Sequence, residues 1–311
     1  MYVKNVTKGS FILKITKFLN EIWKASRPLS LTLAFYSTTL GMAVAHLEGK
    51  LFSGNLAFDL KLIFLATLAG LFVQTGTNFI NDYFECEYKN LHFSDSKKYK
   101  FLGKKRNPFD ILIFLLGILS FLITALLGLY IILITTKKLL LIGLIGIIGG
   151  YAYTGEPIVY KKRGLGTPLS FVLMGPLMVM GTHLAFTHYY SWRPVFLGLP
   201  ISLLIPVLML SNELRDFERD SSLGIKTLTV RIGFKRAKFL YLTLLSSSYL
   251  LTILFVFLNL YPLTALLTLL TIPLALKAYQ NAARAEKKGV PITNQLHLSF
   301  GLIQLLTLFL S

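Results

Sequence analysis

The stretch LKLIFLATLAGLFVQTGTNFINDYFE, residues 60–85, is the most informative part of the chain for its fold. Most of it is apolar, and it is long enough to cross a bilayer, which takes about 20 residues as a helix. Its end differs, because Asn78, Asp82 and Glu85 follow one another closely. A second apolar run ends in the same way, in SNELRDFERDSS at residues 211–222. The sequence therefore predicts two membrane helices that each end in a group of acids.

The composition of the whole chain is that of an integral membrane protein. Of its 311 residues, 54% are hydrophobic and only 15% are charged, against about 25% charged in soluble domains. Apolar runs recur from end to end, which predicts one all-α membrane domain over residues 1–311, and the glycine-rich GLIGIIGG at 143–150 predicts close helix contacts. About nine transmembrane helices are expected, at 29–47, 60–81, 110–134, 139–156, 168–187, 195–212, 239–259, 262–280 and 295–311.

The distribution of basic residues predicts the orientation of the chain. With nine spans, 27 of the 32 Lys and Arg residues fall on the side of the N-terminus. The other side holds only Lys50, Lys61, Lys137, Lys138 and Arg193. Loops rich in Lys and Arg stay in the cytoplasm. We therefore expect a multi-pass protein of the plasma membrane, with its N-terminus and both acidic groups on the cytoplasmic side.

Several other classes of protein are excluded. The net charge of +18 suggests nucleic acid, but no basic arm or nucleic-acid-binding motif is present, so no nucleic-acid partner is expected. The single cysteine, Cys86, excludes an intrachain disulfide and a cysteine-based metal site. The five histidines lack ligand spacing, and no P-loop is present. The sequence gives no indication of the oligomeric state.

The two acidic groups share one spacing. Asn78 and Asp82 are four residues apart, and Asn212, Asp216 and Asp220 repeat that interval. In a helix this interval places the side chains on one face. Each group ends an apolar run on the same predicted side of the membrane, so the two groups are expected at the same depth.

Paired oxygen ligands of this kind suit Mg²⁺, which is commonly bound by one or two carboxylates together with substrate phosphates. Two facing groups of acids would hold a diphosphate through Mg²⁺. Basic residues that would contact the phosphate oxygens are available on the same predicted side of the membrane, namely Lys226, Arg231 and KKR at 161–163.

A simpler interpretation is that the acids are solvated loop charges paired with Arg215 and Arg219. Gln74 and Asn78 argue against it, because both lie inside the apolar run. Polar side chains at that depth are costly and commonly line a functional cavity.

At this point the sequence resembles the UbiA superfamily of intramembrane prenyltransferases, over nearly its whole length. NDYFE at 81–85 and RDFERD at 215–220 resemble the two Asp-rich motifs of that superfamily. Within it, the chain is most similar to the 1,4-dihydroxy-2-naphthoate polyprenyltransferase branch. That similarity lies in ASRPLSL (25–31), YTGEP (153–157), RGLGTPLSFVLMGPLMVMGTH (163–183) and NELRDFERDSSLGIKTLTVRIG (212–233).

The resemblance implies nine helices around a central cavity with a cytoplasmic cap. It implies that four acids bind Mg²⁺ and act in catalysis: Asp82, Glu85, Asp216 and Asp220. It places further residues around the diphosphate: Asn81, Asn78, Asn212, Arg27, Lys226 and Arg231. Tyr153 is expected on the side of the aromatic acceptor.

The first motif departs from the superfamily pattern. Glu85 stands where Asp is usual, and Lys89 and Leu91 occupy the places where a further Asp is expected. Glu87 or Asp95 is a candidate replacement for that acid. We expect Glu85 to be a metal ligand and Lys89 to help hold the diphosphate.

The function implied is Mg²⁺-dependent transfer of a polyprenyl group from an allylic polyprenyl diphosphate to an aromatic acceptor. The branch suggests 1,4-dihydroxy-2-naphthoate and menaquinone biosynthesis, although its GLGE motif reads GLGT here, with Thr167. Transfer to another acceptor, such as a glyceryl lipid, homogentisate, chlorophyllide or haem, is the alternative. A transporter of metal ions or lipids is a third interpretation, but it should need polar stripes that reach the outer face.

Overall fold

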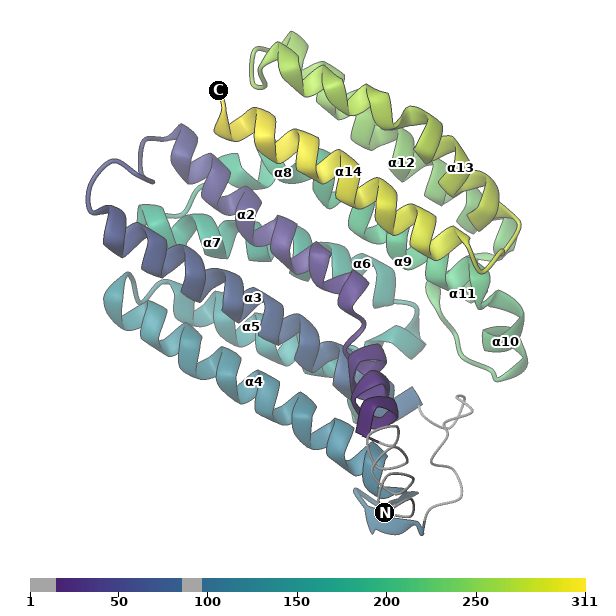
Figure 1. The fold of residues 1–311 in the computed structure, drawn as a ribbon. Coiled ribbons are helices and arrows are strands. Elements are labelled where there is room, and N and C mark those ends of the chain that lie inside the picture. Colours follow the sequence, from purple (N-terminus) through teal and green to yellow (C-terminus); the bar gives the residue numbers. More distant parts are fainter. Residues whose placement is uncertain (1–14, 86–96) are drawn as a thin grey trace, which may run out of the picture.

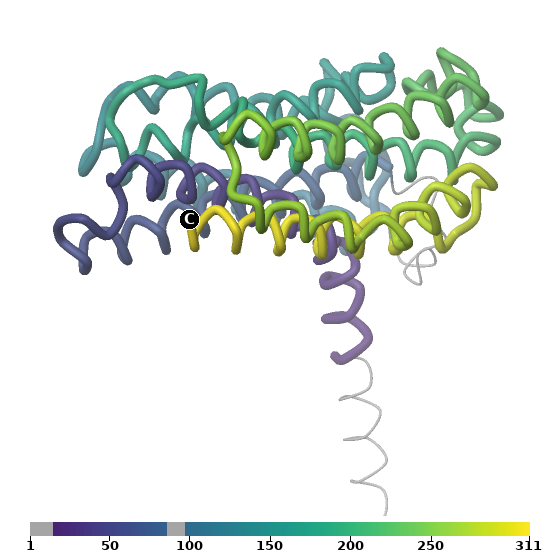
Figure 2. Tube along the Cα trace, turned by 90° about the horizontal axis from the view of Figure 1, so that it is seen from above, coloured from purple at the N-terminus to yellow at the C-terminus, as the bar shows by residue number. Residues whose placement is uncertain are grey.

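Helices make up nearly all of the computed structural model, which describes residues 15–85 and 97–311 (Figure 1). The long helices are α2 (Leu31–Leu47), α3 (Leu56–Glu85), α4 (Pro108–Ile134), α5 (Leu139–Ala152), α7 (Met178–Thr187), α8 (Arg193–Ser202), α9 (Leu204–Arg215), α12 (Phe234–Phe257), α13 (Ile272–Ala283) and α14 (Gly289–Phe309). Shorter helical elements are η1 (Pro28–Ser30), η3 (Tyr160–Arg163), α6 (Gly166–Val172), η4 (Leu173–Leu177), α10 (Phe217–Ser222), α11 (Leu228–Ile232) and η5 (Leu263–Thr271). Residues 15–26 are also helical and project from the bundle (Figure 2).

The helices form a closed bundle. Neighbours along the chain pack against each other from α2 to α5, and α14 packs against both α13 and α2. Every range predicted as a span lies mainly on helix, but in the described part of the chain seven helical stretches are long and apolar enough to cross a membrane. The all-α membrane fold is therefore confirmed, whereas the count of nine spans and the cytoplasmic cap stay predictions.

Glycines allow some of these helices to approach closely. A Cβ on Gly41 of α2 would lie 2.5 Å from the carbonyl oxygen of Val179 in α7, so only glycine fits this contact. The glycine-rich stretch of α5 is different along its length. Gly149 meets Leu173, as the sequence predicts, but a Cβ on Gly143 or Gly146 would have no neighbour within 4 Å. That part of α5 borders open space instead of a helix.

A short hairpin was not predicted by the all-α reading of the sequence. Strands β1 (Tyr99–Phe101) and β2 (Lys104–Arg106) pair antiparallel, and Gly103 has a φ of 76° in the turn between them, a conformation that glycine adopts without strain. The Phe101 ring lies 6.1 Å from the ring of Tyr83 near the end of α3. The hairpin therefore packs against the helix end that carries the first acidic motif.

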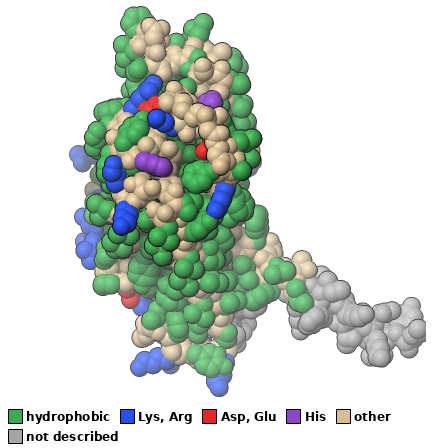
Figure 3. All heavy atoms as spheres, turned by 90° about the vertical axis from the view of Figure 1, so that its left-hand side faces the viewer, with side chains coloured by type: hydrophobic (Ala, Val, Ile, Leu, Met, Phe, Trp, Pro, Cys, Tyr) green, Lys and Arg blue, Asp and Glu red, His purple; other side chains and the backbone are tan. Residues whose placement is uncertain are grey.

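The other end of the bundle is held by a small polar network. His183 in α7 is fully buried, and its Nε2 lies 2.8 Å from Glu48 Oε2. The Tyr189 hydroxyl donates to the same carboxylate at 2.6 Å. Across this end, Figure 3 shows scattered Lys and Arg side chains among mainly hydrophobic and uncharged ones. The network joins the loop after α2 to the loop after α7, far from the acidic motifs.

Candidate active site

One cavity of about 700 Å³ lies where α3 and α9 end. The structure brings the four predicted acids together there, since Asp82 and Glu85 line one side and Asp216 and Asp220 line another. Side chains from residues 21–30, α5, α6 and α14 complete the wall. Sites separated by more than 130 positions in the sequence therefore share one space, although their chemical roles remain predictions.

The polar face of α3 is fixed by hydrogen bonds to the entry of α2. The Asn78 side-chain amide donates to the backbone oxygen of Ser26 at 2.7 Å and to Ser30 Oγ at 2.8 Å. One turn earlier, Gln74 Nε2 donates to Asn78 Oδ1 at 3.3 Å. These bonds satisfy polar groups that lie inside an apolar helix. They also hold the segment that carries Arg27 against the cavity.

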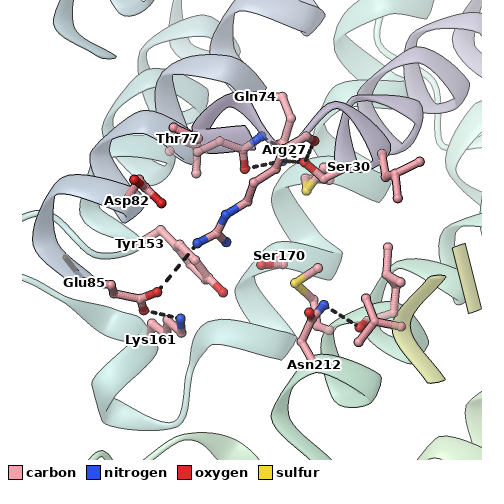
Figure 4. Close-up of a pocket in the computed structure, with 18 of the residues that line it drawn as sticks. Arg27, Ser30, Gln74, Thr77, Asp82, Glu85, Tyr153, Lys161, Ser170 and Asn212 are labelled. Atoms are coloured by element: carbon pink, nitrogen blue, oxygen red, sulfur yellow. Dashed lines mark hydrogen bonds and ion pairs between the residues drawn. The ribbon is translucent and has the colours of Figure 1, made fainter. Parts of the chain in front are cut away.

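Glu85 forms ion pairs with two cationic side chains. Lys161 Nζ makes a hydrogen-bonded ion pair with Glu85 Oε1, and Arg27 NH2 lies 3.7 Å from Oε2. Arg27 also donates to Asn81 Oδ1. Figure 4 shows the guanidinium of Arg27 directed toward Glu85, with Lys161 on the other oxygen. Two cationic side chains thus face the cavity at the first motif.

The backbone of Arg27 helps to direct its side chain. Arg27 has φ 50° and ψ 63°, in the left-handed region, and the proline that follows disfavours the ordinary helical conformation at this position. The backbone N–H and the hydroxyl of Ser30 both donate to the Arg27 carbonyl, at 2.8 and 2.9 Å. A strained residue held in this way is typical of functional sites.

The second motif forms its own ion pairs. The predicted continuous stripe is interrupted, because α9 ends at Arg215 and Asp216 is the junction before α10. Arg215 donates to both carboxylate oxygens of Asp216, at 2.8 and 2.7 Å. Arg219 NH2 lies 3.0 Å from Asp216 and 2.8 Å from Asp220. Arg219 therefore bridges the two acids, in agreement with the pairing expected for loop charges, but inside the cavity wall.

The two acids of this motif differ in proton affinity. Burial raises the pKa of Asp216, but the Arg215 hydrogen bond and the charges of Arg215 and Arg219 outweigh it, so the pKa lies below its ordinary value. Burial raises the pKa of Asp220 above its ordinary value, and Arg219 offsets only part of that effect. The charge of Asp216 adds to the rise at Asp220. The pair therefore resembles two acids that share a site.

Tyr153 forms part of the cavity wall beside these charges. Its ring centroid lies 5.6 Å from Lys161 Nζ, and the ring of Tyr160 meets it edge-on at a centroid distance of 5.5 Å. Figure 4 shows Tyr153 between Arg27, Lys161 and Ser170. An aromatic wall next to a cationic group fits the predicted place of an aromatic acceptor.

Four predicted substrate-binding residues are not seen at the cavity. Asn81 is buried and accepts a hydrogen bond from Arg27, but its side chain does not line the cavity. Lys226 and Arg231 are exposed and do not line it. The Arg231 side chain instead donates from Nε to the backbone oxygen of Lys226 at 3.2 Å and lies over Gly164. Lys89 lies outside the described residues, as do Glu87 and Asp95. The predicted contacts of these residues with a diphosphate stay predictions.

Sequence reasoning did not place three residues of the cavity at the site individually. Lys161 was included only within KKR at 161–163, among the basic residues expected near the phosphate, and Arg219 was considered only as a loop charge. Glu213, which also lines the cavity, was not singled out. One of its two hydrogen-bond partners is Thr167, whose hydroxyl donates to Glu213 Oε1 at 2.8 Å. Where the GLGE motif has a glutamate, this chain has Thr167, and the carboxylate at this contact comes instead from Glu213 of α9. The signal was present in NELRD, where an acid follows Asn212.

The donor set of the cavity fits a hard divalent cation. Carboxylates and side-chain amides supply only oxygen ligands of the kind that Mg²⁺ takes. Within residues 15–85 and 97–311, no three His, Cys, Asp or Glu side chains are grouped closely enough to hold a metal by themselves. Two acids on each side suit a Mg²⁺ ion that completes its coordination with phosphate oxygens and water. The residues therefore fit Mg²⁺ together with a phosphate-bearing substrate.

A second cavity borders the first in the apolar part of the bundle. It has a volume of about 330 Å³ and is lined almost entirely by aliphatic side chains and glycine from α3, α4, α5 and α7. Val73, Gly146, Leu173 and Met178 line both cavities. The polar cavity and the apolar cavity therefore adjoin each other at these four residues.

Comparison with known proteins identifies relatives of the chain. Residues 34–293 match the model of the UbiA prenyltransferase family. The chain is 30% identical over 228 residues to 1,4-dihydroxy-2-naphthoate octaprenyltransferase of Bacillus subtilis, a match that covers 73% of this chain and 70% of that protein. It is 28% identical over 292 residues to UbiA prenyltransferase domain-containing protein 1 of Gallus gallus, which covers 92% and 84% of the two chains.

Solved structures share the fold. A UbiA homologue from Archaeoglobus fulgidus bound to GPP and Mg²⁺ aligns with a TM-score of 0.56 and 16% identity, over 91% of this chain and 99% of that one. A structure of digeranylgeranylglyceryl phosphate synthase aligns with a TM-score of 0.58 and 19% identity, over 93% and 98%. At these identities the likeness establishes a common arrangement of helices.

Proposed function

The chain belongs to the UbiA prenyltransferase family, and on that premise we propose that it transfers a polyprenyl group from an allylic diphosphate to 1,4-dihydroxy-2-naphthoate. The observation that carries the proposal is that two unlike cavities lie next to each other. Acids and cations from both motifs line one cavity, and an apolar cavity shares four of its lining residues. A polyprenyl diphosphate has the same division into a charged head and an apolar tail. We propose that the chain acts as one membrane domain.

The head-group end would hold the diphosphate. We assign Mg²⁺ to Asp82 and Glu85 on one side and to Asp216 and Asp220 on the other, with Asn78, Asn81 and Asn212 nearby. When bound, Mg²⁺ supplies positive charge that stabilises the diphosphate as a leaving group. Arg27, Lys161 and Arg219 already lie beside these acids. Their charges add to the stabilisation of developing negative charge on the phosphate oxygens.

The reaction itself forms one carbon–carbon bond. The bond between the first carbon of the prenyl group and the diphosphate oxygen breaks, and its electron pair leaves with the diphosphate. A ring carbon of the acceptor supplies the electron pair for the new bond. That ring carbon then loses a proton, or its carboxylate as CO₂. The apolar wall keeps water away from the allylic cation.

The acceptor assignment is supported by the relative in Bacillus subtilis, which is a 1,4-dihydroxy-2-naphthoate octaprenyltransferase. Its test is a turnover assay of the purified protein in lipid with Mg²⁺ and octaprenyl diphosphate. The acceptors would be dihydroxynaphthoate, homogentisate and a glyceryl phosphate, with products identified by mass spectrometry. Prenylated naphthoquinol as the main product supports the proposal, and preferred transfer to another acceptor contradicts it.

The position of the active site in the membrane gives a separate prediction. Residues 15–26 lie at the same end as both motifs, and the C-terminus lies at the other end (Figure 1). We propose that the motif end is cytoplasmic, because most Lys and Arg residues lie there. In a Cys86→Ser background, an impermeant thiol reagent added outside cells should label Ser191→Cys but not Ser221→Cys. Labelling of only Ser221→Cys from outside would reverse the orientation.

Glu85 offers a test of the first motif. Glu85→Asp shortens the side chain but keeps its charge, so transfer should persist with an altered Mg²⁺ requirement. Glu85→Gln removes the charge that pairs with Lys161 and Arg27, and we expect it to lose most activity. Steady-state rates at several Mg²⁺ concentrations measure both effects.

The matched control is Glu156→Gln, which removes an acid that is paired with Lys104 outside the cavity. It should leave the rate and the Mg²⁺ requirement unchanged. A Glu85→Gln variant with normal rate and normal Mg²⁺ dependence would show that Glu85 is not a metal ligand.

A further inference from the structure

Glu213 lines the same cavity as the four proposed metal ligands and has no part in the assignments above. It lies on α9, three residues before Asp216, and is buried. In the described part of the chain, no Lys or Arg lies within ion-pairing distance of its carboxylate. The other acids of the two motifs for which contacts are described, Glu85, Asp216 and Asp220, each pair with a cation. The environment of Glu213 therefore sets it apart from the proposed metal ligands.

Both carboxylate oxygens of Glu213 accept hydrogen bonds. The Thr167 hydroxyl donates to Oε1 at 2.8 Å, and the backbone N–H of Thr229 donates to Oε2 at 2.8 Å. Thr167 and Thr229 are also buried, with 2% and 0% exposure. Because both donors are buried, the loss of their acceptor would leave them without a hydrogen-bond partner, which is costly.

The two donors belong to elements that carry opposite parts of the cavity. Thr167 lies in the first turn of α6, which follows the η3 segment that holds Lys161. Thr229 lies in α11, which is the next helix after the α10 segment that holds Asp220. Glu213 thus joins three segments of the chain at one carboxylate. The segment that leads into α6 carries Lys161, which pairs with Glu85 of the first motif. The segments of α9 and α11 adjoin Asp216 and Asp220 of the second motif.

We propose that Glu213 is a positioning residue, which sets the placement of Asp216 and Asp220 relative to Lys161. This role rests on the proposed function, because a diphosphate must contact both sides of the cavity at once. The effect of Glu213 on catalysis is then expected through the affinity for the prenyl diphosphate. The affinity for the aromatic acceptor is expected to change little.

Two substitutions of Glu213 distinguish a role of its hydrogen bonds from a role of its negative charge. Glu213→Gln can keep both bonds, since its oxygen accepts from the Thr229 N–H and its amide donates to the Thr167 hydroxyl, which can also accept. Glu213→Leu keeps the bulk but removes both bonds. Thr167→Val, which removes one donor at nearly constant shape, replaces Glu213→Leu if that variant does not fold. Glu218→Gln is the control, because Glu218 is exposed on α10.

Hydrogen exchange is the first measurement and needs no substrate. In the full-length protein in lipid, Glu213→Leu should speed amide exchange in residues 228–232, whereas Glu213→Gln and Glu218→Gln should match the wild type. This measurement tests the hydrogen bonds of Glu213 directly, so its result does not depend on which acceptor the protein uses. Unchanged exchange in Glu213→Leu would overturn the proposal.

Steady-state kinetics with octaprenyl diphosphate is the second measurement. Glu213→Leu should raise the KM for the diphosphate by about 10-fold or more, with the KM for the acceptor within about 2-fold of the wild type. Thr167→Val should shift the same constant in the same direction by less. Glu213→Gln should stay close to the wild type. If Glu213→Gln loses activity as Glu213→Leu does, the charge of Glu213 acts directly and the positioning role is wrong.

Discussion

Asp82→Asn and Asp216→Asn are each expected to reduce prenyl transfer by at least about 100-fold, while the protein remains folded in the membrane. Asparagine keeps the shape of the side chain and removes the charge that would hold Mg²⁺. Loss of metal-assisted departure of the diphosphate costs several kcal/mol of transition-state stabilisation, and about 1.4 kcal/mol corresponds to tenfold in rate. Initial rates of product formation at saturating Mg²⁺ measure the effect.

The matched control for this pair is Asp59→Asn. Asp59 lies on α3 as Asp82 does, but near the opposite end, where it accepts from the backbone N–H of Phe52 at 2.8 Å. Its replacement also removes a buried acid and should leave the rate of transfer near that of the wild type. Near-normal turnover in Asp82→Asn or Asp216→Asn would contradict the assignment of one site to both motifs.

Gly143→Leu is expected to slow transfer from octaprenyl diphosphate by about 10-fold or more, with transfer from geranyl diphosphate nearly unchanged. Gly143 lines the apolar cavity but not the acidic one, and a Cβ there would meet nothing within 4 Å. A leucine would therefore occupy space that a long tail needs. Each buried methylene contributes about 0.8 kcal/mol, so displacement of part of one isoprene unit is enough for this effect. Values of kcat/KM for the two donors measure it.

Leu141→Phe is the control for added bulk on α5. Leu141 is 62% exposed on the outside of the bundle and lines neither cavity. Both donors should react normally with this variant. Equal loss of activity with short and long donors in Gly143→Leu would show that the tail does not enter the apolar cavity.

The main features of the fold could be predicted from the sequence because lipid restricts the possibilities. Apolar runs of sufficient length must be helical in a bilayer, and helical spacing places Asn78 and Asp82 on one face. The hairpin at 99–106 was missed because its strands carry several lysines and have only three residues each, too few for a pattern of alternation to stand out. The break at Asp216 was missed because the residues there keep a regular spacing of four. In the structure too, hydrogen bonds of helical spacing run across the break, from Asp216 to Asn212 and from Asp220 to Asp216.

The partners within the site could not be predicted in this way. Lys161 pairs with Glu85 across 76 positions, and Thr167 bonds to Glu213 across 46. Such pairs depend on how the helices and loops pack, which local periodicity does not reveal. The same limit explains Arg231, which lies near the second motif in the sequence but contacts Lys226 and Gly164 instead of the cavity.

The most direct test of the central claim is the binding of a non-reactive prenyl thiodiphosphate to the purified protein, measured by calorimetry with and without Mg²⁺. If both motifs hold the diphosphate through Mg²⁺, the wild type should bind at least about 10-fold more tightly with the ion, which corresponds to about 1.4 kcal/mol. The Asp82→Asn/Asp216→Asn double variant should then bind equally weakly in both conditions. Binding by the wild type that does not depend on Mg²⁺, or an unchanged Mg²⁺ effect in the double variant, would contradict the account.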